Sequence, residues 1–124
     1  MTATDYLAAQ RGYIELRHRF HKIMEDFDAL LTPTTPFAAL PVAEADQEAH
    51  YSRINGLCLR NTAAVNLLGL CATSQPCGFT ADGLPIGLQL IGRPFAEARI
   101  LRLARAYETA TQWHTQRPPL QDFS

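Results

Sequence analysis

The chain has 124 residues, of which 47% are hydrophobic and 19% charged, and its formal net charge is -1. That length suits a single domain, residues 1–124, and the composition argues against collagen-like, disulfide-scaffold and disordered proteins. The eleven basic residues are scattered, no apolar run could span a bilayer and the N-terminus has no signal-peptide layout, so we expect a cytoplasmic protein that binds neither nucleic acid nor membranes.

The first predicted element is an amphipathic helix from Tyr6 to Phe27. Larger apolar residues recur there three and four positions apart, which lays one stripe along a helix. The stripe consists of Tyr6, Ala9, Tyr13, Leu16, Phe20, Ile23 and Phe27. We therefore expect this helix to pack on a core. His18 and His21 could share a metal, but no acidic or cysteine cluster completes a site, and surface histidines are the preferred interpretation.

A short buried strand is expected at Ala29–Leu31, ended by Pro33 and Pro36 because proline lacks the amide proton of a strand ladder. The next segment has no sustained period and reads as a surface excursion, with a helical turn around residues 44–50 as one option. A second helix is predicted from an N-cap at Ser52 to a C′ residue at Gly69. Its inward residues would be Ile54, Leu57, Cys58, Val65 and Leu68.

Two further strands are predicted at Leu70–Gln75, broken at Pro76, and at Leu84–Ile91. The Asp82-Gly83 turn signal between them favours a hairpin. Gly87 stands in mid-strand, where glycine indicates either a bulge in a small self-contained sheet or the close approach of another element. After a third helix, Ala96–Trp113, the order of elements predicts an α/β fold in which helices cover a small mixed sheet.

The pattern of residues reveals no complete catalytic site within this chain. Ser52, Ser74 and Ser124 lie in no glycine-serine turn, and a Ser-Lys pair could use only Lys22. The three cysteines, Cys58, Cys71 and Cys77, fit neither a disulfide framework nor a metal knuckle and are expected to be free. Cys77 with His114 stays open as a thiol-enzyme hypothesis, although small buried cysteines are commoner.

Four segments then occur in a particular order: DALLTPTTP (28–36), NTAAVNLLGLCATSQPCG (61–78), DGLPIGLQLIGRPFAEARILRLARAYE (82–108) and TQWHTQRPPL (111–120). Together they resemble the C-terminal portion of the amidase signature family, which includes bacterial amidases and the A subunit of tRNA-dependent amidotransferases. The resemblance covers the chain from about Tyr6 to Leu120. It departs from the family at Cys71, where proline is usual, and this affects the expected geometry of the local turn.

The resemblance implies an α/β/α sandwich and serine-type amide hydrolysis by a Ser–cis-Ser–Lys triad. The triad lies in the N-terminal part of a longer family member, so no catalytic residue is carried over, and no metal or organic cofactor is implied. What the resemblance implies here is scaffold and one wall of a pocket for a small-molecule amide. Thr62 and Asn66 would bind the substrate, with Thr32–Pro36 near the same cleft. Alternatively, Thr62 bonds its own helix backbone and Asn66 ties the helix end to the next loop.

Two hypotheses of different class follow. In the first, the chain is the C-terminal part of a serine-type amidase and is inactive alone, acting as a homo-oligomer or with a partner chain that carries the catalytic part. In the second, it is a non-catalytic module that uses an exposed sheet edge or apolar face to self-associate or to bind a partner.

Overall fold

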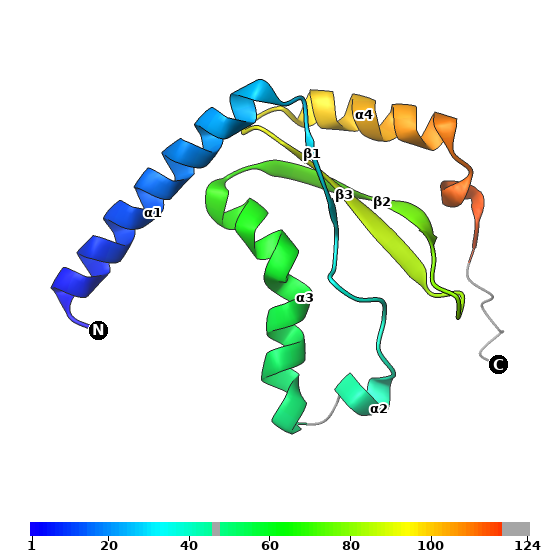
Figure 1. Ribbon diagram of the computed structural model, residues 1–124, viewed down its shortest axis with the longest axis horizontal. Coiled ribbons are helices and arrows are strands. Elements are labelled where there is room, and N and C mark those ends of the chain that lie inside the picture. The colour runs from blue at the N-terminus through cyan, green and yellow to red at the C-terminus, as the bar shows by residue number, and fades with distance from the viewer. Residues whose placement is uncertain (46–47, 118–124) are drawn as a thin grey trace.

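The computed structural model of the protein describes residues 1–45 and 48–117 (Figure 1). The elements are α1 (Ala3–Ile23), the 3-10 turn η1 (Met24–Asp26), β1 (Leu30–Pro33), α2 (Val42–Ala45), α3 (Glu48–Leu68), β2 (Cys71–Phe79), β3 (Pro85–Gly92), α4 (Glu97–Ala110) and the 3-10 turn η2 (Trp113–Thr115). The predicted α/β class is confirmed. The second helix begins earlier than predicted, so Ser52 lies inside α3 and is not its N-cap.

The three strands form one sheet in the order β1-β3-β2, and both pairings are antiparallel. The sheet is therefore purely antiparallel, and the prediction of a mixed sheet is wrong in this respect. The β2–β3 hairpin is confirmed: its turn closes through a hydrogen bond from the Gly83 N–H to the Thr80 carbonyl, and Gly83 takes the positive φ of 80° that favours glycine. The central position of β3 buries its C-terminal half on both faces.

Helices cover the two faces of β3. Leu90 packs with Ile100 and Ala104 of α4 on one face. A side chain at Gly92 would meet Ile100 at 2.5 Å, so the close fit of α4 requires glycine there. Ile91 points to the opposite face by the alternation of a strand, and there it lines a cavity with Val65 of α3.

The end of α3 follows the predicted pattern. Gly69 adopts a φ of 66°, and the Leu70 N–H donates to the Val65 carbonyl, which is the hydrogen bond of a Schellman cap. Cys71 then begins β2, and its thiol donates to the Arg93 carbonyl at 3.1 Å. The departure from the family's usual proline therefore leaves a regular strand start.

β2 continues through Pro76, and the predicted break there is wrong. The Thr34 N–H donates to the Gly87 carbonyl, so the backbone groups of Gly87 point toward β1. Pro76 pairs with Gly87 from the other side, in a position that makes no ladder bond. The missing amide proton thus costs nothing at this edge of the sheet. A register shift between Pro76 and Gly78 leaves Cys77 as a β-bulge.

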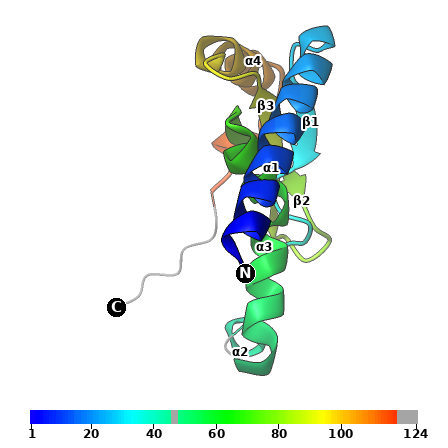
Figure 2. The same ribbon diagram turned by 90° about the vertical axis from the view of Figure 1, so that its left-hand side faces the viewer.

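α1 forms as predicted but is not packed as predicted. Its N-terminus is fixed by a capping box between Thr2 and Asp5, yet none of its residues is buried. It is hydrogen-bonded to the end of α3, where the Tyr13 hydroxyl donates to the Leu67 carbonyl and His21 Nε2 lies 2.8 Å from the Leu68 carbonyl. Figures 1 and 2 show α1 and α3 running away from the sheet in different directions. The apolar stripe of α1 is therefore largely exposed.

The surface area is consistent with this open arrangement. The whole chain exposes 9568 Å², whereas a compact protein of 13.8 kDa is expected to expose about 6,600 Å². No helix in residues 1–45 or 48–117 is long and apolar enough to cross a membrane.

Candidate functional site

Polar side chains gather on the face of the sheet that carries Ile91. The Thr32 hydroxyl donates to Oε1 of Gln89 at 3.1 Å, and Gln89 is only 5% exposed. Ser74 pairs with Gln89 from β2 and so lies on the same face. Thr34 completes the row, with its hydroxyl 2.6 Å from that of Ser74. We call these four residues, Thr32, Thr34, Ser74 and Gln89, the polar row.

Gly87 makes the polar row possible. A β-carbon at Gly87 would lie 2.8 Å from the hydroxyl oxygens of both Thr34 and Ser74. The predicted close approach is confirmed, and it comes from β2 and the end of β1 in this same chain. The other interpretation of Gly87, a β-bulge, also holds in part. The bulge lies at Cys77 of β2, next to Pro76, the residue that pairs with Gly87.

Asn61 connects α3 to the polar row. Its side-chain amide donates to the Pro33 carbonyl at 2.8 Å, which fixes the position of α3 at the end of β1. The sequence interpretation did not single out Asn61. The signal was present, because Asn61 falls between Leu57 and Val65 at helical spacing, and a polar residue within an apolar stripe needs a hydrogen-bond partner.

Thr62 and Asn66 lie one turn apart on α3, next to Asn61. Thr62 is half-buried, and its hydroxyl donates to the Leu59 carbonyl at 3.3 Å, which is the helix-backbone bond given above as the alternative. Asn66 is exposed, and within the described residues its side chain has no hydrogen-bond partner, so the tie to the next loop is not seen. The substrate-binding role of both residues remains a prediction.

A cavity of about 260 Å³ lies between α1, α3 and the sheet. Its wall is mostly apolar, including Phe20, Val65 and Ile91, and Thr32, Asn61 and Arg60 supply polar groups. It joins the polar row to the sheet-facing side of α3. Polar groups from two elements, β1 and α3, therefore converge on this recess.

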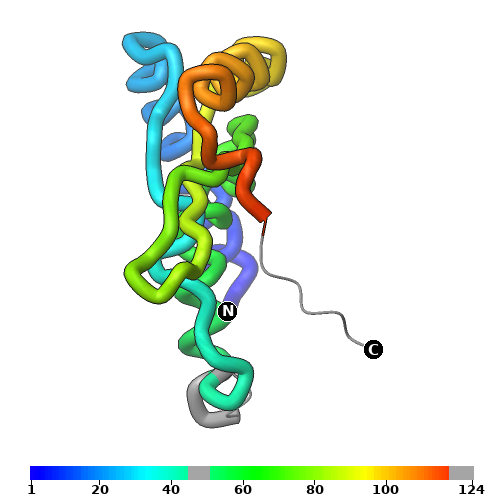
Figure 3. The backbone as a smooth tube through the Cα atoms, turned by 90° about the vertical axis from the view of Figure 1, so that its right-hand side faces the viewer, coloured from blue at the N-terminus to red at the C-terminus, as the bar shows by residue number. Residues whose placement is uncertain are grey.

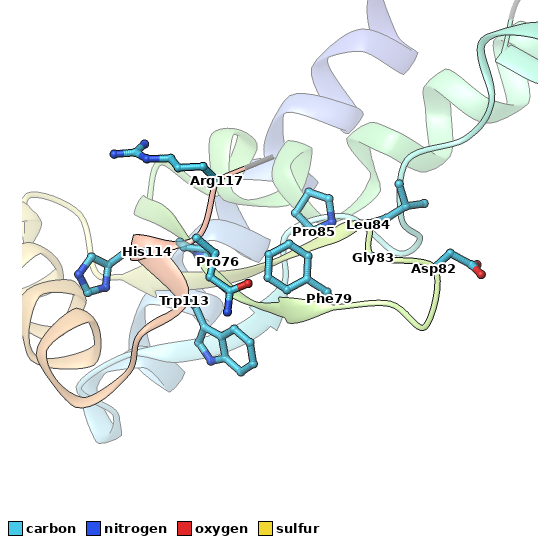
Figure 4. Close-up of a pocket in the computed structure, with 10 residues that line it drawn as sticks. Pro76, Phe79, Asp82, Gly83, Leu84, Pro85, Trp113, His114 and Arg117 are labelled. Carbon is cyan, nitrogen blue, oxygen red and sulfur yellow. The ribbon is translucent and has the colours of Figure 1, made fainter. Parts of the chain in front are cut away.

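A larger cavity of about 720 Å³ lies at the β2–β3 turn. Figure 3 shows η2 passing beside this hairpin, and the Trp113 ring centre is 6.2 Å from that of Phe79. In Figure 4, Pro76, Phe79 and Pro85 lie together, whereas the side chains of His114 and Arg117 point away from them. Its described lining has no serine, threonine, cysteine or lysine, so this cavity offers no hydroxyl, thiol or amine nucleophile.

The thiol hypothesis gains no support. Cys77 donates to the Ile86 carbonyl at 3.5 Å, and no hydrogen bond joins it to His114 in residues 1–45 and 48–117. The three cysteines are free, as predicted.

Burial raises the pKa of Tyr107, and the nearby Cys77 thiolate raises it further. No group of three His, Cys, Asp or Glu residues in the described part of the chain could hold a metal ion.

Comparison with known proteins places this geometry in a family. The amidase family model matches residues 1–101. The A subunit of glutamyl-tRNA(Gln) amidotransferase from Chloroflexus aggregans is 42% identical over 115 residues, which are 93% of this chain and 23% of the relative.

Two solved structures are similar to this one. The A subunit of glutamyl-tRNA(Gln) amidotransferase from Thermotoga maritima has a TM-score of 0.66 at 33% identity, over 89% of this chain and 24% of that one. The 6-aminohexanoate cyclic dimer hydrolase has a TM-score of 0.81 at 26% identity, over 96% and 27%. The chain thus spans about a quarter of the length of its relatives. By its sequence match and its fold, the chain belongs to the amidase signature family.

Proposed function

We propose that the chain acts as the C-terminal part of a serine-type amide hydrolase and is inactive alone. The observation that carries the proposal is the family match over residues 1–101, in a chain whose described residues hold no hydrogen-bonded nucleophile and base. Amide hydrolysis requires an activated nucleophile and donors for the oxyanion. In this proposal the Ser–cis-Ser–Lys triad comes from the catalytic part of the fold, in the same polypeptide or in a partner chain.

The contribution of this chain is a pocket wall. Thr62 follows Asn61 on α3, and Asn66 lies one turn further along the same helix. Their hydroxyl and amide groups can bind a carbonyl or an amino group of a small-molecule amide. The Thr62 hydroxyl is held only by a long hydrogen bond to Leu59, so rotation about its side-chain bond can redirect it to a substrate. The chemistry proposed requires no metal or organic cofactor.

Partner chains are part of the proposal. Two of the three relatives named above are amidotransferase subunits by their names, and a subunit functions in an assembly. Asn61, through its bond to Pro33, would hold α3 against the sheet while the catalytic part closes over it. A cytoplasmic location remains a prediction of the sequence.

The second candidate, a non-catalytic partner-binding module, is favoured by the exposed apolar residues of α1. The edge of β1 suits it less, because Pro33 has no N–H and its carbonyl is already bound by Asn61. If this candidate is right, apolar helix faces rather than strand pairing hold the partner.

Hydrolysis of a panel of primary amides tests the proposal. The purified chain is compared with a chimera in which the preceding residues of the Thermotoga maritima protein are joined to Met1. We expect no turnover from the chain alone and turnover from the chimera. Asn66→Ala and Thr62→Val should lower kcat/KM of the chimera about tenfold or more, while Asn55→Ala, on an exposed position of α3, should not. Turnover by the chain alone that is lost in Ser74→Ala would contradict the proposal.

A further inference from the structure

The C-terminal part of α3 attaches this helix to the rest of the chain. Among the α3 side chains that the structure describes, only Val65 and Leu68 are buried. Asn61 is bound to the end of β1, and Figure 1 shows the earlier part of α3 extending away from the sheet. Thr62 and Asn66 therefore lie between the bond of Asn61 and the C-terminus of the helix.

The last four carbonyl groups of α3 are all hydrogen-bonded, although such groups have no partner within their own helix. They belong to Val65, Asn66, Leu67 and Leu68. The first two accept from the backbone N–H groups of the Schellman cap described above. The third accepts from the Tyr13 hydroxyl, and the fourth lies 2.8 Å from Nε2 of His21. A carbonyl oxygen can only accept, so this nitrogen carries a proton. Half of the cap of α3 is thus supplied by α1.

Arg17 lies on α1 between these two donors. Positions 13, 17 and 21 are four apart and therefore share one face of the helix. A guanidinium nitrogen of Arg17 is 2.7 Å from where a β-carbon of Gly69 would stand. The guanidinium is thus placed at the C-terminus of α3, where the partial negative charge of the helix dipole favours a cation.

The capping residues form most of the contact face of α1. The half-buried residues of this helix are Tyr13, Arg17, Phe20 and His21, and all its other residues are exposed. Three of these four are polar and lie at residues 67–69. Hydrogen bonds require a defined distance and angle, whereas apolar contact is not directional. The contact with α1 can therefore fix the end of α3 in one position.

We propose that Tyr13, Arg17 and His21 are positioning residues of the pocket wall. They hold the last two turns of α3, and these turns carry Thr62 and Asn66. The inference rests on the proposed function for the substrate contacts of Thr62 and Asn66. Asn66 directly precedes the residue whose carbonyl Tyr13 binds, so a displacement of this end of the helix displaces Asn66 with it.

Amide hydrogen exchange in the chain alone tests whether α1 holds the end of α3. Tyr13→Phe removes only the hydroxyl, and His21→Ala removes the imidazole. In both variants, we expect the amides of residues 64–70 to exchange about threefold faster or more. Unchanged exchange in both would overturn the inference.

Matched controls come from the same helix. The Tyr6 hydroxyl is bound to Gln10 within α1, and His18 is exposed. Tyr6→Phe and His18→Ala should therefore leave the exchange of residues 64–70 unchanged. Acceleration in these controls equal to that in the test variants would overturn the inference, because it would show a general loosening of α1.

Kinetics of the chimera described above test whether this contact matters to the substrate. His21→Ala should raise KM by about threefold to tenfold and change kcat by less than about twofold, because losing a contact made equally in the ground and transition states raises KM alone. His21→Gln keeps an N–H donor for the Leu68 carbonyl and should restore KM to within about twofold. In a chimera that already carries Thr62→Val and Asn66→Ala, His21→Ala should change KM by less than about twofold, because the contacts through which it acts are absent.

The outcomes separate this inference from the proposed function. An active chimera whose KM is unaffected by His21→Ala, or changes by the same factor in both backgrounds, would overturn the inference and leave the proposed function standing. Faster exchange without a change in KM would likewise limit α1 to a role in stability. A folded chimera without turnover would contradict the proposed function, and the positioning role would fall with it.

Discussion

The hydroxyl oxygens of Thr34 and Ser74 lie 2.6 Å apart across the α-carbon of Gly87. This contact joins the end of β1 to β2 over the central strand, although 40 positions separate the two residues in the sequence. It can form only where the residue between them has no side chain.

Gly87→Ala should therefore destabilise the chain by about 1–3 kcal/mol, the usual cost of overpacking. Ser74 is exposed and can rotate away, but the β-carbon of Thr34 also lies 3.2 Å from the new methyl, and its N–H is bound to the Gly87 carbonyl. Urea unfolding measures the change. Gly56→Ala in α3 is the matched control: its new methyl meets no atom within 4 Å, so it should stabilise the chain by up to about 1 kcal/mol. An equal effect at both positions would refute this reading of Gly87.

Asn61→Ala should cost about 1 kcal/mol of unfolding free energy, because it removes the donor that binds the Pro33 carbonyl. Asn55→Ala, at an exposed position of the same helix, should change it by less than about 0.5 kcal/mol. For both variants, the change in unfolding free energy is measured from the shift in the urea midpoint, provided that the dependence of free energy on urea concentration keeps the same slope. If the two variants were alike, the Asn61 contact would not contribute to stability.

Acid should weaken the start of α1. The Thr2 N–H donates to the Asp5 carboxylate at 2.8 Å, and this bond, together with the Thr2 side chain, holds the pKa of Asp5 below its ordinary value of 3.8. A depressed pKa in the folded state means that the stabilisation is present above pH 3.8 and is lost as pH falls through the folded value. Helicity followed by circular dichroism should decline in that range, and the contribution of Asp5 to the decline should be absent in Asp5→Asn.

Alkali should act on Tyr107. Burial, and then the Cys77 thiolate, raise its pKa above the ordinary 10.0. A raised pKa in the folded state gives stability that is present below pH 10 and lost as pH rises through the folded value. The ionisation of Tyr107 should be seen as the difference between the alkaline absorbance titration of the chain and that of the Tyr107→Phe variant. In Cys77→Ala the titration should move toward lower pH without reaching the ordinary value, because burial remains; no movement would exclude the thiolate as a cause.

Apolar patterns in the sequence were sufficient to find the three long helices and to locate the three strands, and the Asp82-Gly83 turn signal identified the hairpin. The Gly69 cap was readable because a left-handed residue favours glycine. The break at Pro76 was wrong because the side of a strand on which a proline nitrogen lies depends on register, and register is set by partners distant in sequence.

The candidate site was less accessible from sequence. Asn61, Thr34 and Ser74 come from three separate segments, and their meeting depends on how α3 and β1 dock on β3. The exposure of α1 was equally hidden. Its apolar stripe specifies that something covers it, but a pattern of residues does not say whether the cover belongs to the same chain.

The connectivity of the sheet has a consequence for how the chain folds. β2, β3 and α4 follow one another directly, so their contacts close short loops, and we expect this unit to form early. β1 pairs with β3 across some sixty residues, as Leu30 does with Ile91, and the entropy of closing that large loop must be offset before β1 can join. The polar row, which draws on β1, should thus be the last part of the sheet to assemble and the first to open.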